Sequence, residues 1–202
     1  MNRGNFSRAI PVILIVIIVI IAIAAIVSLA RSIFGGNDSG TEQVDQGQSS
    51  LVSTDVTRSV RLTERGPIVA DENFRSYQIT VTPTTRTMTV YEGYLDNVID
   101  TKTYPNNTPA YEEFVHALSR AGMMSGEELM NDADDTRGIC ATGHVYEYET
   151  LQTERTVKRL WTSDCKGAGK GSLDKQVKPR DLNQLFHLQI PDSDDLIDLL
   201  DD

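Results

Sequence analysis

The longest hydrophobic run in the chain covers residues 9–30, which are mostly Ile, Val, Leu and Ala and carry no charge. At about 1.5 Å of rise per residue, a helix of this length crosses the roughly 30 Å hydrocarbon core of a bilayer. The run is also longer than the apolar core of an ordinary cleaved signal peptide. The pattern therefore predicts an uncleaved transmembrane signal anchor at 9–30, with cleavage after Ala30 as the alternative.

The charges on either side of this run predict its orientation. The leader, residues 1–8, carries Arg3 and Arg8 and no acidic residue, whereas Arg31 is followed by acidic residues. Positively charged flanks stay preferentially on the cytoplasmic side of a membrane. We therefore expect a cytoplasmic N-terminus, a single pass through the cell membrane, and an extracytoplasmic C-terminal part.

Two further segments lack the pattern of a folded core. Residues 31–53 are rich in Gly, Ser, Gln and Asp, which predicts a flexible tether. Residues 192–202 form an acidic tail that contains an apolar stripe. That stripe consists of Leu196, Ile197, Leu199 and Leu200. It is interpreted as an amphipathic helix packed loosely on its own domain, and a docking peptide for a partner or plain disorder are the alternatives.

The intervening segment, residues 54–191, predicts an extracytoplasmic domain with a sheet. Alternating apolar and polar residues, the period of a half-buried strand, occur at 58–63, 77–82, 86–94, 98–104, 144–151 and 157–162. Short turn-like gaps separate the first four segments, and another separates the last two. Gaps of this length favour antiparallel pairing, first as a meander and then as a hairpin.

Apolar residues recur at helical spacing in two main places, 108–122 and 179–190. Thr108 is predicted as the N-cap of the first helix, and Pro191 is expected to end the second. A capping-box pattern predicts a short helix at 125–130. The fold class is therefore α+β, with about five to six antiparallel strands, two main helices on one face, and one disulfide.

The disulfide is predicted from the positions of Cys140 and Cys165, the only cysteines. They flank the second hairpin, so the paired strands bring them together. Outside the cytoplasm such a pair is expected to be oxidised. A catalytic cysteine is the alternative.

The composition argues against some functions, and no motif in the sequence has the spacing of a known catalytic or metal-binding site. The 202 residues include 19 Lys+Arg and 29 Asp+Glu, and this acidic balance argues against a nucleic-acid partner. The Gly-Lys-rich loop 166–172 lacks P-loop spacing, and the acidic loop 131–136 is followed by Arg137 where a calcium loop needs Gly. The histidines, which lack metal-site spacing, are His116, His144 and His187. We expect no cofactor or metal, and a non-enzymatic role is favoured.

The resulting hypothesis is a membrane-anchored extracytoplasmic binding or interaction module, part of a cell-envelope assembly, with a protein partner at its sheet face or acidic tail. One alternative is a surface hydrolase whose catalytic groups come from distant segments, which requires a pocket where a histidine and an acid converge. The other is a filament subunit. An apolar N-terminal helix, an antiparallel sheet and a late disulfide are similar to type IV pilins, and Arg3-Gly4 resembles a prepilin cleavage site, although Ala9 stands where pilins carry Glu.

Overall fold

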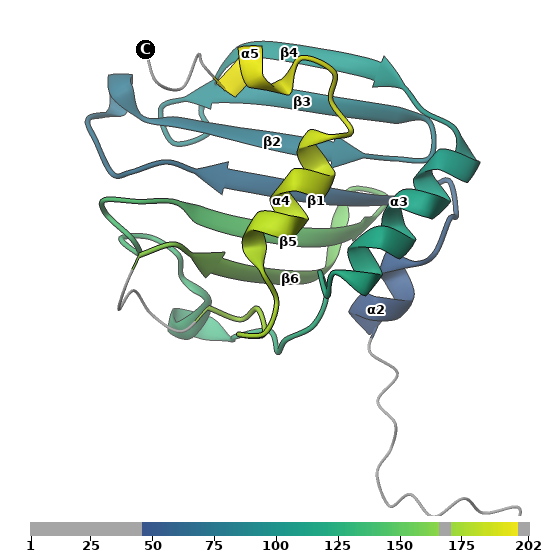
Figure 1. The fold of residues 1–202 in the computed structure, drawn as a ribbon. Helices are drawn as coiled ribbons and strands as arrows, with labels where there is room; N and C mark the ends of the chain where they lie inside the picture. Colours follow the sequence, from purple (N-terminus) through teal and green to yellow (C-terminus); the bar gives the residue numbers. More distant parts are fainter. Residues whose placement is uncertain (1–45, 166–170, 198–202) are drawn as a thin grey trace, which may run out of the picture. The chain divides into compact units, whose positions relative to one another are not determined.

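The computed structural model describes residues 46–165 and 171–197 (Figure 1). The predicted leader, the anchor, Leu199 and Leu200 lie outside these residues. Within the described ranges, no helix has the length and apolarity needed to cross a bilayer. The described residues belong to one compact unit of the chain, Asp45–Asp202.

A six-stranded antiparallel sheet forms the centre of this unit, in the order β4-β3-β2-β1-β5-β6. The strands are β1 Arg58–Arg65, β2 Arg75–Val81, β3 Thr85–Glu92, β4 Asn97–Pro105, β5 Val145–Gln152 and β6 Arg155–Ser163. The meander β1–β4 and the hairpin β5–β6 meet where β1 pairs with β5. Both predicted antiparallel units are therefore confirmed, as is the α+β class.

The helices of the described unit cover one face of this sheet (Figure 1). They are α2 Gln46–Leu51, α3 Thr108–Arg120, α4 Pro179–His187 and α5 Ser193–Ile197. The described residues also contain short 3-10 turns at Asp71–Asn73 and Asn131–Asp134. The core beneath them combines alternate strand residues such as Leu62 and Ile79 with Phe114, Phe186 and Leu196 from the helices. Burial of this apolar area provides most of the driving force for folding.

The opposite face of the sheet combines a small apolar cluster of Cys140, Val145 and Trp161 with a network of charged side chains. Glu147 of β5 is almost buried there, with Arg65 Nε at 3.0 Å and Arg159 Nε at 2.8 Å. Arg159 also contacts Asp134 at 2.8 Å, and the indole of Trp161 donates to the same carboxylate at 3.2 Å. Asp134 belongs to the acidic loop that resembled a calcium site, and its carboxylate is held by these two contacts.

The short helix predicted at 125–130 is wrong. Gly126 adopts φ +144°, a conformation that favours glycine, and it forms an isolated bridge with Leu173. The Glu128 carboxylate, the expected capping group, instead accepts a hydrogen bond from the backbone N–H of Arg159 at 2.8 Å. Pairing with a distant segment therefore replaces the local helix.

Three boundaries also differ from the prediction. The N-cap of α3 is Asn107, whose side chain accepts from the backbone N–H of Ala110 at 3.0 Å, and Thr108 is the first helical residue. Residues 46–51 were predicted as tether but form α2, because Leu51 is buried in the core. Helix α4 ends at His187, before the proline expected to stop it.

Candidate functional site

A chain of polar side chains lies at one end of the sheet, and we call it the Glu64 chain. Its members are Glu64 of β1, Tyr77 of β2, His144 before β5, Asp164 after β6, and His187 at the end of α4. Glu64 continues the alternation that points Val60 and Leu62 into the core, so its carboxylate lies on the helix-covered face. A carboxylate in this position is unfavourable unless polar groups reach it.

Distances along the Glu64 chain make it nearly continuous. One Asp164 oxygen accepts from the backbone N–H of His144 at 2.8 Å, and the other lies 3.2 Å from the Nδ1 atom of His144. The Nε2 atom of His144 is 3.9 Å from Glu64 Oε1. The Tyr77 hydroxyl donates to Glu64 Oε2 and lies 2.8 Å from His187 Nε2. Asp164 therefore orients the imidazole of His144 so that its other nitrogen faces Glu64.

Burial shifts the acidity of this cluster. Desolvation raises the pKa of Glu64, while the hydrogen bond from Tyr77 and the charge of His144 oppose the increase. Burial likewise lowers the pKa of His187. An acid whose pKa is perturbed beside a histidine is typical of functional sites.

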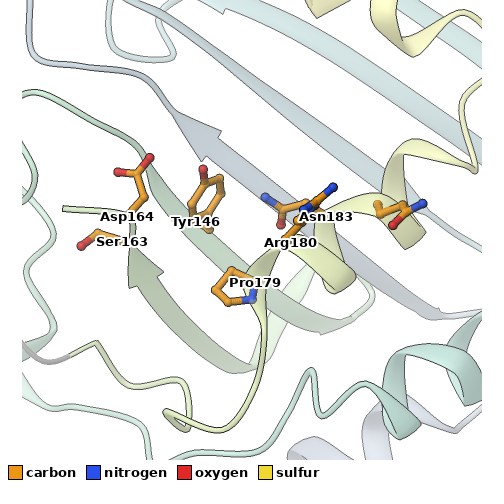
Figure 2. A pocket seen from close by; sticks show the side chains of 7 residues that line it. Tyr146, Ser163, Asp164, Pro179, Arg180 and Asn183 are labelled. Carbon is orange, nitrogen blue, oxygen red and sulfur yellow. The ribbon is translucent and has the colours of Figure 1, made fainter. Parts of the chain in front are cut away.

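The first of two hollows beside the Glu64 chain lies against α4 and has a volume of about 640 Å³ (Figure 2). We call it the α4 hollow. Its lining residues are Tyr146, Ser163, Asp164, Pro179, Arg180, Asn183 and Gln184. They come from β5, the end of β6 and α4, so the hollow exists only because these distant segments pack together. Asn183 is held in place by the Tyr148 hydroxyl, which donates to its Oδ1 at 2.6 Å.

The second hollow, which we call the Glu64 pocket, has a volume of about 380 Å³. Its lining residues are Glu64, Gly66, Pro67, Val69, Asn73, Arg75, Ser76, Tyr77, His144 and Ile197. Two contacts fix the wall formed by the β1–β2 loop. The backbone N–H of Ile68 donates to the Ala141 carbonyl at 2.9 Å, and the Tyr94 hydroxyl donates to the Val69 carbonyl at 3.0 Å.

The predicted disulfide between Cys140 and Cys165 is present, with a Cα–Cα distance of 5.2 Å. It fixes the segment that carries Asp164 beside the segment that leads to His144. Within the described residues, the one grouping of potential metal ligands is Asp164 with these two cysteines. Because both sulfurs are bonded to each other, neither supplies the thiolate that a metal requires.

The other residues singled out in the sequence have different surroundings. His116 is exposed on α3, whereas His144 and His187 belong to the Glu64 chain. Leu196, one of the four residues of the apolar stripe in the tail, is buried in the core, and Ile197 lines the Glu64 pocket.

Sequence reasoning missed Glu64 as a site residue. Its signal was an acid at a core-facing position of a strand, directly in phase with two buried apolar residues. No protein-family model matches the chain, and no curated protein is significantly similar to it.

Proposed function

We propose that the protein is a membrane-anchored extracytoplasmic binding module that holds a small polyhydroxylated ligand in the α4 hollow. The observation that carries the proposal is the convergence of hydrogen-bonding side chains from three separate segments on one hollow of about 640 Å³ (Figure 2). This volume falls within the range typical of small-molecule sites. The uncharged run at 9–30 supports the anchor, and the disulfide supports an oxidising compartment.

The chemistry of the lining supports a ligand with several hydroxyl groups. Arg180 supplies planar donors, Asp164 supplies acceptors, and the amides of Asn183 and Gln184 supply both. The ring of Tyr146 adds an apolar surface against which carbon atoms of a ligand can pack. Hydroxyl groups need donors and acceptors together, and this lining provides both.

The ligand is tested by titrating the full-length chain, in an uncharged detergent, with maltotriose, cellotriose and chitotriose under calorimetry. At least one trisaccharide should bind, and Arg180→Ala should weaken its binding by about tenfold, equivalent to one charged hydrogen bond. The matched control is Arg155→Ala, which removes an exposed arginine at the turn of the β5–β6 hairpin. Failure of all three sugars to bind, or equal weakening by the control, would contradict the ligand class.

The location is tested separately, by adding protease to intact cells that express the full-length chain. The proposed topology places the disulfide-containing domain outside, so it should be digested without cell lysis. Protection of the domain until lysis would refute the topology. A protein partner at the sheet face opposite the helices or at the acidic tail belongs to the same proposal.

A surface hydrolase is the second candidate, because His144 and two acids meet beside both hollows. Among the described residues, however, no serine or threonine hydroxyl is hydrogen-bonded to either histidine of the Glu64 chain. The arrangement therefore suits general-base activation of water better than a Ser-His-Asp mechanism. If the protein hydrolyses nitrophenyl esters or glycosides and His144→Ala abolishes that activity, the hydrolase is favoured. An N-terminus processed after Gly4 would instead favour the filament subunit.

A further inference from the structure

The carboxylate of Glu64 forms part of a pocket in which the protein leaves one of its oxygens without a close partner. We propose that the Glu64 pocket binds the ammonium group of a primary alkylamine, with Glu64 Oε1 as the counter-ion. This site is distinct from the α4 hollow and is independent of the ligand of that hollow.

The two oxygens of Glu64 differ in their contacts. Oε2 accepts the hydrogen bond from the Tyr77 hydroxyl. Oε1 has His144 Nε2 at 3.9 Å, which is longer than a hydrogen bond. The carboxylate has about four lone-pair sites, and its side chain is 16% exposed. An ammonium group, with three donors, can therefore reach an acceptor that is already largely desolvated.

The charged groups around the pocket favour a cation. Arg75 is the one arginine or lysine among its described lining residues, and its Nη1 lies 3.6 Å from Glu92 and donates to the Glu72 carbonyl at 2.7 Å. His144 is shared with Asp164. The pocket thus contains an acid whose neighbouring bases already contact other acceptors, so an incoming cation would complete the charge balance.

The walls of the pocket specify the rest of the ligand. Pro67 and Val69 line it from the β1–β2 loop, and Ile197 lines it from α5. These apolar side chains suit a short carbon skeleton, whereas the carboxylate suits its charged end. Because the loop is held by hydrogen bonds to Ala141 and Tyr94, the walls are formed before a ligand arrives.

Binding of an ammonium group should be linked to the protonation of Glu64. The empty pocket disfavours the charged carboxylate, whereas a bound cation favours it, so binding releases a proton from Glu64. The titratable groups that face Glu64 directly or through Tyr77 are Tyr77, His144, Tyr146, Tyr148, Asp164 and His187, and Arg75 lines the same pocket. Affinity for the amine should therefore increase as the pH rises through the raised pKa of Glu64.

The test is an NMR titration of the full-length chain in an uncharged detergent, observing the imidazole resonances of the three histidines. The probe is n-butylamine hydrochloride, and n-butanol is the uncharged comparison. Millimolar butylamine should shift the His144 resonances with saturation, and butanol should not. Equal shifts with butanol, or no saturable shift with butylamine, would overturn the proposal.

Variants assign the site within the same experiment. Glu64→Gln should weaken butylamine binding at least tenfold. Glu149→Gln removes one negative charge from the sheet face opposite the helices and should leave butylamine binding unchanged. If Glu64→Gln does not fold, the comparison of the two probes on the wild type decides, and equal shifts of the His144 resonances by butylamine and butanol overturn the proposal. Arg180→Ala separates the two sites, because it should impair sugar binding in the α4 hollow and leave butylamine binding intact.

Discussion

Replacing Glu147 by Gln tests how much its ion pairs with two arginines, on the sheet face opposite the helices, stabilise the fold. The carboxylate is 6% exposed, with Arg65 Nε at 3.0 Å and Arg159 Nε at 2.8 Å. The variant keeps the size of the side chain but removes its charge, and it turns an amide donor toward a guanidinium that is itself a donor. Glu149→Gln is the matched control, because this residue lies on the same strand and face with a longer contact, 3.6 Å to Arg61.

The expected loss follows from the number of charged contacts and their exposure. A hydrogen bond to a charged group contributes about 1.5–3 kcal/mol, and Glu147 accepts one from Arg159 Nε. Arg65 Nε adds an ion pair at 3.0 Å that lacks the geometry of a hydrogen bond. The arginine side chains are 32% and 21% exposed, so water replaces part of the interaction when the charge is removed. We expect Glu147→Gln to lower the free energy of unfolding by about 2–3 kcal/mol, against about 0.5 kcal/mol for Glu149→Gln.

Trp161 is the only tryptophan and provides the assay, because its indole donates to Asp134, which Arg159 also contacts. Urea unfolding of the full-length chain is followed by its fluorescence at constant detergent concentration. With a slope of about 2 kcal/mol per molar urea, the Glu147 variant should unfold about 1 M earlier than the wild type. If both variants shift the midpoint equally, the reasoning about the buried carboxylate is refuted.

Three further predictions concern the disulfide, a helix cap and the pocket acid. Changing Cys140 and Cys165 to Ser should lower unfolding stability by about 3.5 kcal/mol, as the 25-residue separation implies; labelling of either thiol in unreduced protein would contradict the bond. Asn107→Ala should lower the free energy of unfolding, measured by thermal unfolding, by about 1 kcal/mol. Asn107→Asp should leave it unchanged. Because the pKa of Glu64 is raised above 4.5, its folded form keeps a proton that the unfolded chain has lost. Stability relative to Glu64→Gln should thus fall as pH rises through the window above 4.5, and a difference that does not vary with pH would contradict this.

The sheet was predictable because each strand carries a two-residue period that is set by burial on one face. Leu62 and Ile79, for example, alternate with polar neighbours and become partners in the core. The segment 125–130 could not be predicted in the same way. Its capping-box pattern is a local signal, whereas its conformation depends on the bridge between Gly126 and Leu173, which are far apart in the sequence.

The candidate site has the same dependence on distant contacts. The cysteine pair followed from the topology, because the ends of one hairpin must be close. The Glu64 chain instead joins residues from β1, β2, α4 and both ends of the β5–β6 hairpin. No spacing rule connects Glu64 with His144 or His187. What the sequence did contain was the acid itself, since Glu64 is in phase with Val60 and Leu62, the two buried apolar residues that precede it on β1.

The edges of the sheet bear on how the protein can assemble. On β6, the backbone N–H of Arg159 donates to the Glu128 carboxylate at 2.8 Å, and that of Trp161 donates to the Ser172 hydroxyl at 2.7 Å. The Trp161 carbonyl accepts from the backbone N–H of Leu173 at 3.1 Å. These contacts use backbone groups that an added strand would need, so this edge is closed by the chain itself.

The β4 edge is protected in a different way. The Asp100 side chain accepts from the backbone N–H of Thr101 at 2.7 Å, Pro105 has no N–H to offer, and the pairing with β3 is interrupted by a bulge. Charged side chains, proline and bulges at an edge all oppose the addition of another strand. A filament made by strand addition between copies of this domain is therefore disfavoured, and a pilin-like subunit would have to associate through other surfaces. Ligand binding in the two hollows has no such requirement, because each hollow is formed within a single domain.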